Sequence, residues 1–233
     1  MRVLRGRCED HVADHERTQR LADEVADSRD PALRVWRPHR QVAFGRRDAR
    51  SVGYDRAREI ATERGYAVLE RSVGGRAVAY TGSTVAVALA TPVDGDRSGI
   101  QRRYDDASDR LRSALEGLGA DATPGEPPES FCPGSHSLQA AGKLVGIAQR
   151  VRQRVAVVAA VVIVDDHDAV AAVLEPVYEA LGVPFDPDSV GSLARAGDTT
   201  DAEAVIEALT GAFVGDRPTT VEFVTDDSGL RDT

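Results

Sequence analysis

Hydrophobic residues recur at helical spacing in five parts of the chain. Within residues 11–29, for example, Val12, Leu21 and Val25 recur at roughly the period of an amphipathic helix. Four more helices are predicted, over residues 51–65, 100–118, 168–181 and 201–213. The longest apolar run is short and β-branched, which indicates a buried strand over residues 155–164. No run approaches the roughly 18 apolar residues of a membrane-spanning helix.

Short segments typical of β-strands lie between these helices. Residues 33–37 and 41–45 are predicted to form a strand pair, and residues 66–71 a further strand. Residues 77–80 and 84–90 are predicted to form a second pair across a three-residue turn. Strands that are joined by tight turns rather than by helices run antiparallel. We therefore expect a largely antiparallel sheet.

The predicted fold is α/β of the α+β kind: one mixed sheet with flanking helices. A Pro/Gly/Asp-rich stretch at residues 119–128 is expected to be a loop. We expect a single domain over residues 1–233, without a separate C-terminal accessory domain.

The charge of the chain is acidic and diffuse. The formal net charge is -9 and the isoelectric point is about 5.1. This argues against a nucleic-acid partner, which would require a basic patch. Arginine in place of lysine, together with few aromatic residues, resembles halophilic composition. No apolar stretch follows the basic N-terminus, so we predict no signal peptide, no membrane association and a cytoplasmic location.

Lys143 is the only lysine in the chain, and it lies between Gly142 and Gly146. A primary amine is a compact charge with rotatable donors, so it is not interchangeable with a guanidinium. A chain that avoids lysine can also retain one by chance. The two cysteines, Cys8 and Cys132, are too few for a disulfide framework and lack metal-ligand spacing, so no metal site is predicted.

Three segments carry residues suited to chemistry. In residues 71–78, paired glycines allow close approach to the backbone and arginines could meet an anion, although an ordinary hairpin turn is the alternative. Residues 130–136 place Cys132 in a Cys-Pro-Gly turn, where the thiol is either exposed and reactive or buried. In residues 142–150, Lys143 opens a predicted strand. Contact between Lys143 and Cys132 is feasible, because only a loop or hairpin separates them.

Taken together, the order and spacing of these segments resemble the lipoate-protein ligase and octanoyltransferase superfamily, which has the biotin/lipoate protein ligase (BPL/LPL) catalytic-domain fold. The resemblance covers about residues 30 to 165 and is greatest to the cysteine-dependent amidotransferases that move octanoyl or lipoyl groups. It rests on these motifs: Trp36, Gly45-Arg46-Arg47-Asp48, Arg71-x-x-Gly74-Gly75-Arg76-Ala77-Val78, Cys132-Pro-Gly-Ser135 and Gly142-Lys143-x-x-Gly146-x-Ala148-Gln149-Arg150.

The resemblance implies an enzyme of protein lipoylation. Cys132 would take an octanoyl or lipoyl group as a thioester and pass it to the lysine of a lipoyl domain. Lys143 would stabilise negative charge that develops on the acyl carbonyl. The partners would be the glycine cleavage H protein and E2 subunits of 2-oxoacid dehydrogenases, and no cofactor would be needed. The implied substrate-binding residues are Arg71, Gly74, Gly75, Arg76, Gly142, Gly146 and Gln149.

The chain departs from the pattern of many relatives in three places. Glu70 stands where they have an arginine, Ala79-Tyr80-Thr81 where they have an aspartate, and Ser137 where they commonly have an acidic residue. His136 is next to the predicted active-site turn, but we interpret it as a solvated loop residue rather than a general base.

Other functions are compatible with the same motifs. An ATP-dependent lipoate-protein ligase would use ATP and Mg²⁺ and would bind lipoyl-AMP with Lys143, and Cys132 would then be incidental. Biotin-protein ligase is a weaker variant, because the Gly-Arg-Gly-Arg type of loop is missing at Gly74-Gly75-Arg76. A non-catalytic relative that only binds lipoyl domains is a third alternative, which the presence of both Cys132 and Lys143 disfavours.

Overall fold

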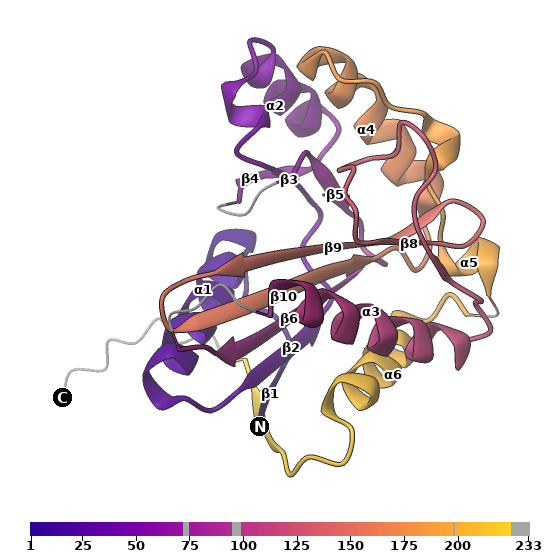
Figure 1. Cartoon of the computed structure of the whole chain (residues 1–233). Coiled ribbons are helices and arrows are strands. Elements are labelled where there is room, and N and C mark those ends of the chain that lie inside the picture. Colours follow the sequence, from indigo (N-terminus) through magenta and orange to yellow (C-terminus); the bar gives the residue numbers. More distant parts are fainter. Residues whose placement is uncertain (72–74, 95–98, 198, 225–233) are drawn as a thin grey trace.

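Two β-sheets with flanking helices form the molecule, as seen in the computed structural model (Figure 1). The structure describes residues 1–71, 75–94, 99–197 and 199–224. The helices are α1 His11–Ser28, α2 Tyr54–Glu63, α3 Ile100–Glu116, α4 His167–Leu181, α5 Leu193–Ala196 and α6 Ala202–Val214, with 3-10 turns at Asp48–Arg50 and Pro187–Ser189. The strands are β1 Arg2–Arg5, β2 Ala32–Trp36, β3 Gln41–Phe44, β4 Ala67–Glu70, β5 Val78–Tyr80, β6 Val85–Pro92, β7 Thr123–Pro124, β8 Ser137–Gln139, β9 Lys143–Val151, β10 Val155–Val162 and β11 Thr220–Phe223.

The larger sheet has eight strands in the order β11-β1-β2-β6-β10-β9-β8-β7, and the smaller has three in the order β4-β3-β5. All neighbours in the larger sheet are antiparallel except the two pairs that involve β1. The predicted mixed and largely antiparallel fold with flanking helices is thus confirmed. The expectation of one sheet is wrong, because a second sheet stands apart from the first.

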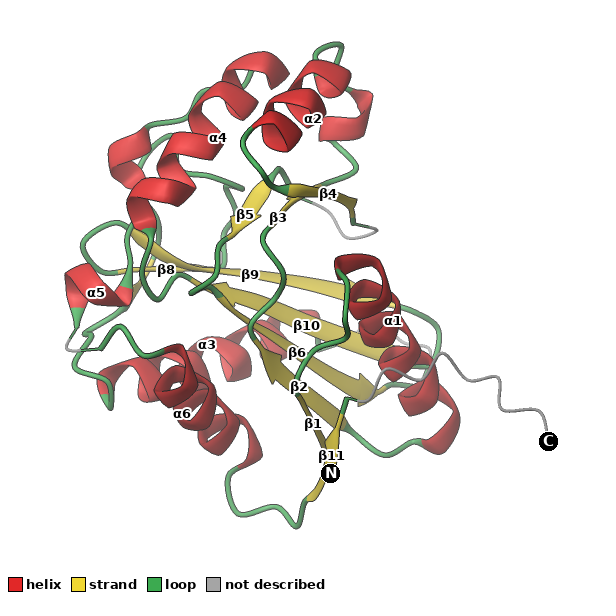
Figure 2. Ribbon diagram, turned by 180° about the vertical axis from the view of Figure 1, so that it is seen from behind, coloured by secondary structure: helices red, strands yellow, loops and turns green. Residues whose placement is uncertain are grey.

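Three hydrophobic cores hold the layers together. Helices α3 and α6 pack on one face of the large sheet, and α1 covers part of the other face (Figure 2). Helices α2 and α4 pack together on the small sheet. The long apolar segment predicted as a buried strand is β10, at the centre of the large sheet. The inner faces of the two sheets therefore meet near β5, β9 and β10.

Both predicted strand pairs are wrong in their partners. Strands β2 and β3 lie in different sheets, as do β5 and β6. The connection between β5 and β6 is a crossover rather than a hairpin turn, and its buried threonines bond to each other: the Thr81 N–H donates to Thr84 Oγ1 at 2.9 Å. These strands find their partners far away in sequence, which the local pattern of hydrophobic residues does not specify.

No helix in the described part of the chain is long and apolar enough to cross a membrane. Four strands, β1, β7, β8 and β11, were not predicted from the sequence, and β7 lies within the stretch that was expected to be a loop. β1 and β11, close to the two ends of the chain, pair in parallel with each other. β1 lies between β2 and β11, and β11 forms this edge of the large sheet.

Candidate active site

The side chain of Cys132 lies between the two sheets, in the loop that connects β7 to β8. Cys132 has a φ of 43°, an uncommon left-handed conformation for a residue other than glycine. Its thiol is partly exposed, and it lines a small cavity of about 60 Å³. The walls of this cavity are formed by β5, β9 and β10 and include Gly146 and Val161.

Two hydrogen-bond donors face the sulfur of Cys132. Arg71 Nη2 lies 3.2 Å from Sγ and also donates to the Arg76 carbonyl oxygen at 2.6 Å. The main-chain N–H of Arg76 is 3.4 Å from Sγ. Burial alone would lower the pKa of Arg71, but Cys132 and Tyr80 reverse this and raise it. These donors are placed to stabilise a thiolate, the nucleophilic form of cysteine.

Gly75 leaves room for this arrangement. Its φ of 104° is left-handed, and an added Cβ would come within 2.7 Å of Cys132 Sγ and 3.0 Å of Arg71 Nη2. Asp48, which sequence reasoning did not single out as a site residue, accepts hydrogen bonds from the Gly45 N–H at 2.9 Å and from Arg76 at 3.3 Å. The Asp48 carboxylate therefore holds the segment that presents the Arg76 N–H.

Lys143 lies beneath the Cys132 turn and is fully buried. Its ammonium donates to the carbonyl oxygens of Phe131 at 2.8 Å and Cys132 at 2.9 Å, and to Glu126 at 2.7 Å. Glu126 in turn accepts from Ser137 Oγ at 2.7 Å and from the Gly134 N–H at 2.9 Å. The lysine and the glutamate thus clamp both sides of the turn.

Glu126 places a carboxylate next to Ser137, the residue that stands where proteins with a similar turn commonly have an acidic residue. It comes from the loop before the turn, and the Ser137 hydroxyl is hydrogen-bonded to it. In the sequence, Glu126 stands between Gly125 and Pro127 in the Pro/Gly/Asp-rich loop, with no pattern around it that indicates a role. Sequence alone did not indicate that this loop would fold back onto Lys143.

Tyr178 of α4 fixes the main chain of Cys132 from the other side. Its buried hydroxyl accepts the Cys132 N–H at 2.6 Å and donates to the Ala77 carbonyl oxygen at 2.9 Å. Burial raises the pKa of Tyr178 well above 10, so the hydroxyl stays protonated and able to donate. Tyr178 thus holds the main chain of Cys132 while Arg71 and Arg76 face its sulfur.

Tyr178→Phe is expected to lower the free energy of unfolding by about 1–3 kcal/mol, because it leaves the buried Cys132 N–H without an acceptor. Alkylation of Cys132 by iodoacetamide should also become slower, since the turn no longer holds the sulfur against Arg71. The matched control is Tyr66→Phe, which removes a 3.4 Å hydrogen bond to Ala169 in the same helix. Equal alkylation rates for the two variants would contradict this role.

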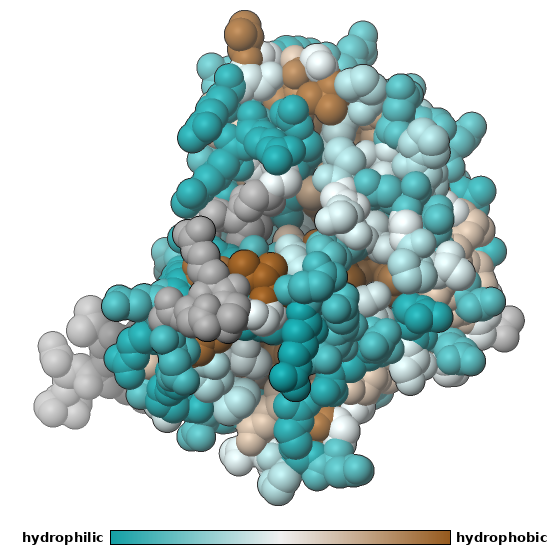
Figure 3. All heavy atoms as spheres, in the orientation of Figure 1, coloured by the Kyte–Doolittle hydropathy of each residue, from teal (hydrophilic) through white to brown (hydrophobic). Residues whose placement is uncertain are grey.

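A second, largely apolar cavity of about 170 Å³ adjoins the first on the sheet face covered by α1. The two cavities share four lining residues: Arg71, Tyr80, Ala159 and Ala160. Small side chains such as Ala86 and Ala88 of β6 form its floor. In a space-filling view, hydrophobic residues show near the middle of a face that is largely hydrophilic around them (Figure 3).

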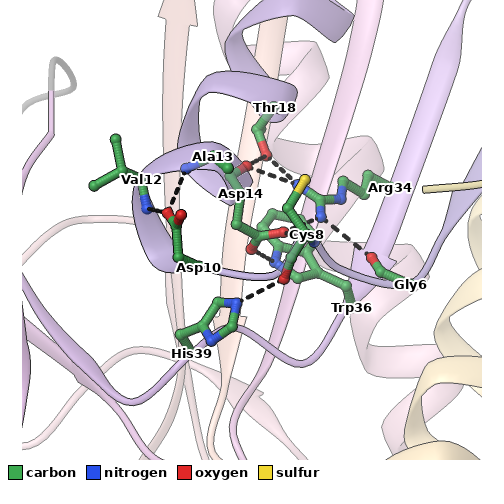
Figure 4. Close-up of polar contacts among 10 residues, drawn as sticks. All are labelled: Gly6, Cys8, Asp10, Val12, Ala13, Asp14, Thr18, Arg34, Trp36 and His39. Atoms are coloured by element: carbon green, nitrogen blue, oxygen red, sulfur yellow. Dashed lines mark hydrogen bonds and ion pairs between the residues drawn. The ribbon is translucent and has the colours of Figure 1, made fainter. Parts of the chain in front are cut away.

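A buried ionic cluster supports the far wall of the larger cavity (Figure 4). Arg34 of β2 is fully buried and pairs with Asp14 of α1, and it also donates to Thr18 Oγ1 at 2.7 Å. Trp36 Nε1 donates to the other Asp14 oxygen at 2.8 Å. The main-chain N–H of Cys8 donates to Asp14 at 3.0 Å, so this buried cysteine belongs to the cluster and not to the cavity. The cluster fastens α1 to β2.

The structure brings together most of the residues singled out from the sequence. Cys132, Lys143, Arg71, Gly75 and Arg76 converge on one turn, as their contacts show. Gly74 lies outside the described residues, so its predicted role stays a prediction.

The three remaining predicted residues are Gly146, Gly142 and Gln149. Gly146 lines the small cavity. Gly142 packs against Gly191, and an added Cβ there would come within 2.6 Å of the Gly191 nitrogen. Gln149 bonds to α3 instead, accepting from Arg103 at 2.6 Å. His136 lies outside the helices and strands, as expected, but it is only partly exposed, and its ring stacks on Tyr104 with centroids 3.7 Å apart.

Comparison with known proteins places this chain in a family. The lipoyl protein ligase A/B catalytic domain family matches residues 13–214. The chain is 32% identical over 134 residues to the octanoyl-GcvH:protein N-octanoyltransferase of Geobacillus kaustophilus, covering 57% of this chain and 47% of that one. It is 28% identical over 120 residues to the lipoyl-GcvH:protein N-lipoyltransferase of Listeria monocytogenes, covering 51% and 43%. The matched region thus spans about half the length of these curated relatives.

The fold is also found in a solved structure. The crystal structure of lipoate-protein ligase A bound with ATP superposes with a TM-score of 0.76 at 21% identity, covering 97% of this chain and 89% of that one. At this identity the likeness shows the fold alone. Because the family match spans most of the chain, the protein belongs to the lipoyl protein ligase A/B catalytic domain family.

Proposed function

We propose that this protein is an acyltransferase of protein lipoylation, which moves an octanoyl or lipoyl group through a thioester on Cys132. The observation that carries the proposal is the placement of the Cys132 sulfur. It lies against two donors, Arg71 Nη2 and the Arg76 N–H, beside an apolar cavity. The names of the curated relatives, which are octanoyl and lipoyl transferases, support the same reaction class.

The apolar cavity fits a slender acyl chain. Strand register places Gly146 beside Val161 at the Cys132 end, and Arg150 beside Val157 toward the other end. These levels are four residues apart on β10, which corresponds to roughly 13 Å at about 3.3 Å per residue. Alanines along the floor keep the passage open. An extended medium-length chain attached to Cys132 could therefore lie along β10.

Transfer would proceed in two balanced steps. In the first, Sγ bonds to the acyl carbonyl carbon, the C–N bond to the donor lysine breaks, and the thiol proton ends on the departing amine. In the second, the acceptor lysine amine attacks the thioester, the C–S bond breaks, and a proton returns to sulfur. The Arg76 N–H and the Arg71 guanidinium are placed to stabilise the negative oxygen formed in each step.

As a transferase the protein would need no nucleotide, because the covalent intermediate conserves the reactivity of the acyl group. Its partners would be lipoyl-domain proteins. The H protein of glycine cleavage is the first candidate, since the curated relatives carry GcvH in their names. E2 subunits of 2-oxoacid dehydrogenases are further candidates.

Lys143 would act mainly through the turn. All three donors of its ammonium are bound to Glu126 and to the carbonyl oxygens of Phe131 and Cys132. We therefore assign it to holding Cys132 in place. A direct contact between Lys143 and the acyl carbonyl would require these hydrogen bonds to be exchanged.

The test is incubation of the protein with octanoylated H protein in the absence of nucleotide, followed by mass spectrometry. A hydroxylamine-labile octanoyl adduct on Cys132 is expected. Cys8, the other cysteine, is buried and serves as an internal control that should remain unmodified. Absence of the adduct, together with ATP-dependent attachment of free lipoate, would overturn the transferase in favour of a ligase.

A further inference from the structure

The departing lysine amine of an amide donor must gain a proton before the C–N bond breaks. This requirement follows from the proposed function and applies to an amide far more than to an activated ester. A suitable group must carry a proton near neutral pH and must border the cavity that contains Cys132.

The obvious donors near Cys132 are already engaged. The Lys143 ammonium is fully buried, is bound to three acceptors and does not line the small cavity. The Tyr178 hydroxyl already donates to the Ala77 carbonyl oxygen. His136 does not line the small cavity, and its ring stacks on Tyr104.

Tyr80, the last residue of β5, meets these requirements. It lines both cavities, at the junction that also contains Arg71. Within residues 1–71, 75–94, 99–197 and 199–224, no hydrogen bond occupies its hydroxyl. Burial raises the pKa of Tyr80 and so keeps the phenol protonated, whereas the nearby Arg71 charge acts in the opposite direction. The same charge is placed to stabilise a short-lived phenolate.

We propose that Tyr80 relays the proton in both acyl-transfer steps. In the first step the Tyr80 hydroxyl gives its proton to the amine nitrogen as the C–N bond breaks. In the same concerted transfer the Tyr80 oxygen takes the proton that the Cys132 thiol releases as the C–S bond forms, so the phenol is restored. In the second step Tyr80 carries a proton from the attacking acceptor amine to the departing sulfur. No proton is gained or lost over either step.

The experiment compares two octanoyl donors with Tyr80→Phe. One donor is octanoylated H protein, an amide, and the other is p-nitrophenyl octanoate, whose leaving group departs without protonation. Acylation of Cys132 by the amide should fall by about 10²-fold or more, the size expected for the loss of a general acid. Acylation by the ester should stay close to wild type. Tyr54→Phe, whose hydroxyl lies 3.4 Å from Glu70, is the control and should match wild type on both donors.

Each outcome decides the proposal. Loss of rate on both donors to the same degree would show that Tyr80 only shapes the cavity, and unchanged rates on both would show that it carries no proton. Either result overturns the relay and leaves the acyltransferase intact if the wild-type protein accepts the amide. A wild-type protein that is acylated by the ester but never by the amide would instead overturn the proposed function, and the relay with it.

Discussion

Replacing Cys132 with alanine should abolish nucleotide-independent octanoyl transfer, by on the order of 10⁴-fold or more, as expected when a covalent nucleophile is removed. No other thiol is available, because the only other cysteine, Cys8, is buried within the Asp14 cluster. The rate is measured by intact-mass analysis of the octanoyl group moving from octanoylated H protein to a lipoyl domain that lacks it.

The loss should be catalytic and not a folding defect. Cys132 is partly exposed, and alanine removes a single sulfur atom with its contacts to Arg71, to the Arg76 N–H and to the edge of the core. The free energy of unfolding should therefore change by no more than about 1 kcal/mol. Cys8→Ala is the matched cysteine control and should keep its transfer activity. Lipoate attachment that depends on ATP and survives in Cys132→Ala would contradict the thioester route.

Local sequence pattern predicted most elements of the fold but not their partners. The amphipathic spacing in residues 11–29 corresponds to α1, and the predicted opening of a strand at Lys143 is the start of β9. Strand pairing failed because β2, β3, β5 and β6 all pair across long sequence distances. Hydrophobic periodicity specifies which face of a strand is buried, not which strand lies beside it.

The residues of the candidate site that lie in short sequence motifs could be predicted, and the others could not. Arg71, Gly75, Cys132 and Lys143 each lie in a motif and converge in space. Tyr178 lies in none of these motifs. It belongs to α4, and the apolar spacing of that helix explains why Tyr178 is buried but does not indicate a use for its hydroxyl. Glu126 and Tyr80 were missed for a related reason: their roles depend on how a loop and a second sheet fold around Cys132.

Lys143→Met is expected to destabilise the fold by about 3 kcal/mol, the lower end of the range for breaking a buried ion pair, because Glu126 keeps some exposure. The change strands a carboxylate and leaves the carbonyl oxygens of Phe131 and Cys132 without their donor. Lys143→Arg should also be destabilising, since a planar guanidinium does not replace a compact ammonium between three acceptors. Chemical denaturation of the three proteins gives the free energies of unfolding.

Acidification provides an independent check on the same pair. Burial alone would raise the pKa of Glu126, but hydrogen bonds from Lys143, Ser137 and the Gly134 N–H lower it below its ordinary value of 4.5. A carboxyl group with a lowered pKa stabilises the folded state above the pKa that it has in the unfolded chain, and this contribution is lost as pH falls through the lowered value. Wild-type stability should therefore decline below about pH 4.5 more steeply than that of a Lys143→Met/Glu126→Leu double variant, which has no carboxylate at this position. Equal slopes for the two proteins would show that the Glu126–Lys143 pair does not hold the Cys132 turn.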